Sequence, residues 1–164
     1  MLEVLRAHGL QAGPTQRPLY AGALAGILAE IPALAILQRY DVLDVLAGGH
    51  GGVEVRWAIM HALAMAIGGA GYGLIFQRAA NDRKGGWLFG MAYGFLLWMV
   101  TAVPLLQWLP SQPLLRGIPL IALFVAHLVW GFSMGLCFPY VHAPLKASLC
   151  RKAAGDWIEK LGWR

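Results

Sequence analysis

Charged residues are scarce in this sequence. Lysine, arginine, aspartate and glutamate make up 13% of the 164 residues, whereas 59% are hydrophobic and the mean hydropathy is +0.59. Soluble globular domains carry about 25% charged residues, so this composition excludes a water-soluble protein. The length corresponds to one compact domain. We therefore expect one integral membrane domain over residues 1–164.

Cysteine and the common catalytic motifs are scarce or missing as well. The two cysteines, Cys137 and Cys150, do not form a CxxC pair, which argues against a disulfide framework or a zinc ribbon. The chain also has no P-loop and no HExxH. With no complete catalytic constellation, we do not expect an enzyme.

Long apolar runs are what the sequence has in abundance. Four of them are close to the roughly 20 residues that a helix needs to cross the hydrocarbon core of a bilayer. They are Leu19–Leu37, Trp57–Phe76, Trp87–Leu106 and Ile118–Tyr140. The predicted fold is therefore all-α, a polytopic membrane protein with four transmembrane helices.

The basic residues predict the orientation of these spans. Of the 13, only Arg39, Arg56 and Arg116 would lie on one side of the membrane. The other ten are Arg6, Arg17, Arg78, Arg83, Lys84, Lys146, Arg151, Lys152, Lys160 and Arg164. Because short loops rich in lysine and arginine stay in the cytoplasm, we expect a multi-pass protein of the bacterial inner membrane with both termini cytoplasmic. The net charge of +5 then indicates contact with anionic lipid and not with nucleic acid.

A repeated pattern of glycine and histidine groups the spans in pairs. Glycines four apart occur in the first, third and fourth runs, and Gly22 precedes His61 by 39 residues while Gly90 precedes His127 by 37. This spacing predicts two tandem helical hairpins in the same orientation. Glycines at such spacing let two membrane helices approach closely. The predicted packing positions are Gly22, Gly26, Gly90, Gly94, Gly131 and Gly135.

Each predicted span also carries a polar residue in its outer half: Glu30, His61, Thr101 and His127. Such groups usually face the interior of the bundle and pair. We expect a hydrogen bond from Glu30 to His127, shared with His61 or Thr101. The cluster is then either internal glue between helices or a functional site: a proton relay, a quinone pocket or a metal centre. In the last case His61 and His127 are candidate axial ligands of a b-type haem, although the paired glycines argue for a bundle too narrow for a porphyrin.

The final segment, residues 145–164, mixes apolar and basic residues. Leu149, Trp157 and Leu161 alternate there with Lys152 and other cations. A helix of this composition lies in the headgroup layer with its tryptophans towards the acyl chains. We expect a cytoplasmic amphipathic tail, with membrane lipids as partners and bound lipid on the protein.

The four-span layout and the stretch His127-Leu-Val-Trp-Gly131, followed by Gly135, resemble small bacterial inner-membrane proteins of the YagU-like kind. The resemblance covers much of the chain and implies the compact four-helix plan. It implies no particular activity, and no catalytic residue is carried over from it.

The function that these features favour is a non-catalytic accessory or scaffold subunit of a larger membrane complex, bound to other membrane subunits or to itself. The reasons are short loops, glycine-lined helix faces and the missing catalytic motifs. Two alternatives remain open. One is a redox protein that binds quinone or b-type haem through His61 and His127; the other is a small transporter built from the two hairpins, with Pro32 and Pro104 as the hints of broken helices.

Overall fold

The computed structural model describes residues 18–43, 55–80, 82–104 and 117–160, and in this part of the chain every regular element is helical. The elements are α2 (Pro18–Arg39), α4 (Val55–Ala80), α5 (Gly86–Leu97), the π-helix η1 (Trp98–Ala102) and α7 (Ile118–Lys160). The all-α prediction is confirmed for these residues.

Three of the described helices are long and apolar enough to cross a membrane: Pro18–Arg39, Ala58–Phe76 and Ile118–Leu145. They coincide with the first, second and fourth predicted spans. The third predicted span, Trp87–Leu106, corresponds to a shorter apolar helix, Gly86–Thr101. The last two residues of the predicted span lie outside the described part of the chain. A multi-pass membrane protein is compatible with this arrangement.

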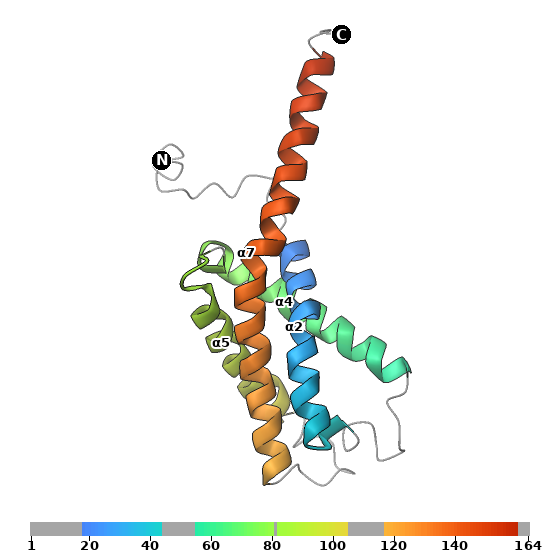
Figure 1. Ribbon diagram of the computed structural model, residues 1–164, viewed down its shortest axis with the longest axis vertical. Coiled ribbons are helices and arrows are strands. Elements are labelled where there is room, and N and C mark those ends of the chain that lie inside the picture. Colours follow the sequence, from blue (N-terminus) through green and yellow to red (C-terminus); the bar gives the residue numbers. More distant parts are fainter. Residues whose placement is uncertain (1–17, 44–54, 81, 105–116, 161–164) are drawn as a thin grey trace.

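Helix α2 is central because its two neighbours both pack along it. It packs against α4 on one side and α7 on the other, α5 packs along α7, and α4 touches α5 and α7 over shorter stretches. Figure 1 shows α2 and α7 side by side, with α4 crossing them obliquely. The buried face of α2 consists mainly of alanine and glycine, which allows close approach on both sides.

The π-helical turn η1 continues α5 without a break. The backbone N–H of Val103 bonds to the carbonyl of Trp98, five residues earlier. Pro104 follows this turn, and a proline has no N–H to donate while its ring excludes the carbonyl one turn before it. Proline is therefore a physical reason for the wider turn at this point.

Helix α7 is 43 residues long. It continues through Pro139 and Pro144 and past Leu145 as far as Lys160. At about 1.5 Å per residue it measures about 64 Å, twice the thickness of a hydrocarbon core. Figure 1 shows its C-terminal part projecting beyond the other helices. The predicted tail is thus helical and continuous with the span, and its position in the headgroup layer stays a prediction.

An aromatic cluster fills the space between α4, α5 and α7. Tyr72 and Phe138 are fully buried, with ring centroids 5.7 Å apart, and Tyr93 lies 5.6 Å from Tyr72. The hydroxyl of Tyr72 donates to the carbonyl of Gly86 at 3.0 Å, and that of Tyr93 donates to the carbonyl of Gly68 at 2.9 Å. These two bonds connect α4 and α5, whose shared contact is small.

Candidate functional site

The first pair of helices meets at glycines. A Cβ atom added to Gly22 would overlap the backbone carbonyl of Gly69, and one added to Gly26 would overlap the carbonyl of Met65. A carbonyl oxygen on a helix cannot rotate away as a side chain can. The α2–α4 contact therefore requires the absence of a side chain at these positions.

The second pair, α5 and α7, is built in the same way. A Cβ added to Gly90 would overlap the carbonyl of Gly131, and one added to Gly131 would overlap the carbonyl of Gly90. A Cβ added to Gly94 would overlap the carbonyl of His127. At Gly135 it would meet the backbone at the start of α5. All six predicted packing glycines thus lie where two helix backbones touch.

The matching contacts align the α2–α4 pair with the α5–α7 pair. Gly26 meets the carbonyl of Met65 and the Cα of Gly69, and Gly94 meets the carbonyl of His127 and then Gly131. His127 therefore corresponds to Met65, one helical turn from His61. The sequence spacing had suggested that His61 and His127 occupy equivalent positions in the two helix pairs. The glycine contacts show that the position equivalent to His127 is Met65.

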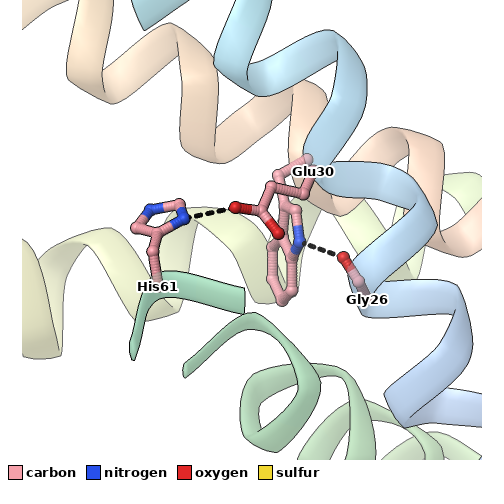
Figure 2. Close-up of polar contacts among 4 residues, drawn as sticks. Gly26, Glu30 and His61 are labelled. Carbon is pink, nitrogen blue, oxygen red and sulfur yellow. Dashed lines mark hydrogen bonds and ion pairs between the residues drawn. The ribbon is translucent and has the colours of Figure 1, made fainter. Parts of the chain in front are cut away.

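Glu30 pairs with His61. The Oε1 atom of Glu30 lies 2.5 Å from Nδ1 of His61, and the two side chains are 9% and 22% exposed. The contact joins α2 to α4, and Figure 2 shows the carboxylate pointing at the imidazole. The expected bond from Glu30 to His127 is wrong in its partner, because α4 and not α7 presents a histidine to this carboxylate.

One turn away on the same helix, α2 is tied to α7. The indole Nε1 of Trp130 donates to the carbonyl of Gly26 at 2.9 Å (Figure 2), and Trp130 is 2% exposed. Trp130 was not among the polar residues predicted from the sequence. A buried indole needs an acceptor, and its spacing of three residues after His127 was the signal that could have placed it near the polar residues.

His127 and Thr101 bond to their own helices. Nδ1 of His127 lies 2.9 Å from the carbonyl of Leu123, and the Thr101 hydroxyl donates to the carbonyl of Leu97 at 2.6 Å. His127 lies one turn before Trp130, whose indole bonds to the carbonyl of Gly26 on α2. The structure thus joins Glu30 to His61, places His127 in their vicinity and leaves Thr101 bonded to its own backbone.

The protonation pattern of the imidazoles decides what they can bind. A carbonyl oxygen only accepts, so Nδ1 of His127 carries the hydrogen, and Nε2 holds the lone pair in the neutral ring. Nδ1 of His61 is likewise the nitrogen turned to Glu30. Anchoring through Nδ1 is how metal-binding histidines are usually oriented. Among the described residues, no group of three or more histidine, cysteine, aspartate or glutamate side chains could hold a metal ion.

The letters GFSMG at residues 131–135 match the nucleophile elbow GxSxG. That motif depends on a sharp turn between a strand and a helix, which exposes the serine. Here the stretch lies in the middle of α7, and its two glycines are used in packing against α5. Ser133 is therefore not set up as a nucleophile.

Comparisons with protein families, curated proteins and solved structures find no match to this chain. The resemblance to YagU-like proteins accordingly stays a prediction from the residues quoted for it.

Proposed function

We propose that the protein is a four-span subunit of the bacterial inner membrane that acts as a non-catalytic accessory or scaffold within a larger membrane assembly. Helix α5 together with η1 supplies the remaining span, because both continue end to end from Gly86. One glycine contact holds each hairpin together, and the hydrogen bond from Trp130 on α7 to the carbonyl of Gly26 on α2 joins the two hairpins. This architecture builds a rigid core and leaves helix faces for partners.

The observation that carries the proposal is the exposure of α4. Only 17% of the most apolar stretch within Ala58–Phe76 is buried inside the chain, compared with 39% for the corresponding stretches of α2 and α7. The exposed side chains lie on one face of the helix, which we call the α4 outer face: Ile59, Met60, Leu63, Ile67 and Ile75. A second membrane subunit packed on this face, with lipid around the remaining surface, accounts for a helix that is so little buried within its own chain.

The assembly role predicts that the protein is purified with a companion. Native mass spectrometry of the full chain in mild detergent should show a complex above the 17.8 kDa of one chain. Leu63→Trp on the α4 outer face should release the companion, since a bulky ring disrupts helix packing. Leu96→Trp on the exposed side of α5 is the matched control and should not. A wild-type protein that appears as a monomer carrying lipid alone would contradict the proposal.

Orientation follows from the end of the bundle at which the basic residues lie. The guanidinium of Arg83, in the turn between α4 and α5, lies 5.4 Å from the ring centroid of Tyr140 on α7. This turn therefore lies beside the part of α7 that leads into its basic extension, whereas Arg39 ends α2 at the opposite end (Figure 1). We propose that the Arg83 end is cytoplasmic.

The proposed orientation predicts the behaviour of C-terminal fusions. A fluorescent protein, which folds in the cytoplasm, should be bright when fused after Arg164. Alkaline phosphatase, which needs the periplasm for its disulfides, should be inactive at the same position. The opposite pair of results would overturn the orientation.

A second candidate function is supported by the two imidazoles. Nδ1 of His127 is held by the carbonyl of Leu123, so Nε2 is the nitrogen through which this ring can bind a ligand, and Nδ1 of His61 lies against the carboxylate of Glu30. We propose as the alternative a redox-ligand-binding protein that takes a quinone-type molecule or a b-type haem in the outer half of the bundle. A preparation with neither a Soret band nor extractable quinone would exclude this alternative, and the assembly role would be the function that remains.

A further inference from the structure

Trp98 has a buried hydrogen-bond donor with no partner. Its indole Nε1 is the single buried side-chain nitrogen or oxygen atom that lacks a hydrogen bond within the described part of the chain. An indole N–H can only donate, and leaving it unsatisfied in a buried position costs free energy. Trp87 and Trp130 both have acceptors, the carbonyls of Lys84 and Gly26. Trp98 is the exception, and an acceptor from outside the chain can reach it once the side chains packed over it move aside.

The backbone at this residue is unusual as well. Trp98 is the first residue of the π-helix η1, and such wide turns within helices occur frequently at functional sites. Its ring packs against Phe124 of α7, with centroids 4.8 Å apart, and stacks on Phe95. The donor therefore lies among aromatic side chains inside the membrane-spanning part of the protein.

A residue with a hydrogen-bond acceptor, His127, lies on the stretch of α7 that packs along this part of α5. Gly94, one turn before Trp98, touches the backbone of His127, and Phe124 lies one turn before His127 on α7. Because the Nδ1–H of His127 is used by the Leu123 carbonyl, Nε2 of the neutral ring can only accept. Trp98 thus supplies a donor from η1 at the end of α5, and His127 supplies an acceptor from the neighbouring stretch of α7.

We propose that Trp98 Nε1–H and His127 Nε2 bind the phenolic headgroup of a lipid-soluble quinol. The ligand oxygen accepts from Trp98, and its hydroxyl hydrogen is donated to His127. The oxidised quinone has no hydroxyl hydrogen, so it can satisfy Trp98 but not His127. The site therefore selects the reduced form by hydrogen bonding alone. This inference rests on the second candidate function and narrows its ligand class.

The test compares the two redox forms of one probe. The full chain in nanodiscs is titrated by calorimetry with decylubiquinol under anaerobic conditions and with decylubiquinone. Wild type should bind the quinol about five- to tenfold more tightly, the effect of one additional hydrogen bond. His127→Leu should lose this preference while keeping its affinity for the quinone. Trp98→Phe should weaken binding of both forms, and Trp87→Phe, at the other end of α5, should weaken neither.

Each remaining outcome counts against the inference. If wild type binds both forms equally, or binds neither, the donor–acceptor assignment is wrong, although the companion subunit in native mass spectrometry can still be present. A Soret band that disappears in both His61→Ala and His127→Ala would show that the histidines hold haem, which supports the second candidate function and overturns the quinol site. If Trp98→Phe does not fold, His127→Leu alone decides, because the preference for the quinol depends on His127.

Discussion

Replacing Gly131 by alanine should already disrupt the pairing of α5 with α7, and replacing it by leucine should abolish it. A Cβ at this position overlaps the carbonyl of Gly90 and lies 3.1 Å from the Cα of Gly94. The obstacle is backbone on a helix, so relief requires the two helices to separate. Overpacking of a core typically costs about 1 to 3 kcal/mol, occasionally more, and backbone overlap places Gly131→Leu at about 3 kcal/mol or above.

Unfolding of the purified protein by SDS in mixed micelles measures this loss of stability. Gly68→Ala is the graded control, because its added Cβ would meet the Trp130 ring at 3.2 Å, a side chain that can adjust. Ala92→Leu tests size alone, since Ala92 is exposed on α5. An unfolding curve for Gly131→Ala that coincides with wild type would show that the α5–α7 contact does not form as described.

Sequence reasoning could predict the helices because membrane spans are defined by length and apolar composition, which are local properties. The first span was placed at residues 19–37 and lies within α2, and the fourth was placed at 118–140 within the longer α7. The end of α7 could not be predicted as well, because nothing apolar marks where a helix leaves the membrane. The π-helical turn at Trp98 was also missed, since it depends on how Pro104 is accommodated.

The candidate site could be predicted only as a set of polar residues. Glu30 and His61 do meet, but which of the residues pair depends on which helices face one another. The oblique path of α4, set by contacts such as Gly26 with Met65, brings His61 to Glu30 and leaves His127 to its own helix. The glycine spacing in the sequence does not predict the angle at which α4 crosses α2. Trp98 and Trp130 were missed for a related reason: a tryptophan in an apolar run indicates packing, whereas the fate of its N–H depends on neighbours far along the chain.

The pairing found in the structure predicts that His61, and not His127, stabilises the bundle through Glu30. His61→Leu removes the partner of the Glu30 carboxyl group, whose side chain is only 9% exposed. Leaving a buried polar group without its partner costs about 1 to 3 kcal/mol, and more if it is charged. His127→Leu should cost less, about 0.6 kcal/mol, because the Leu123 carbonyl keeps its helical backbone bond. Glu30→Gln should be mild, since an amide can still bond to the imidazole.

A double-mutant cycle separates the Glu30–His61 bond from the rest of the packing. Glu30→Leu combined with His61→Leu removes both partners, so no buried polar group is left unsatisfied and part of the lost stability should return. The coupling free energy from SDS unfolding should be about 1 to 3 kcal/mol for this pair and near zero for Glu30→Leu combined with His127→Leu. If the larger coupling were found with His127 instead, α2 would face α7 and not α4 at Glu30, and the arrangement of the polar layer given above would be wrong.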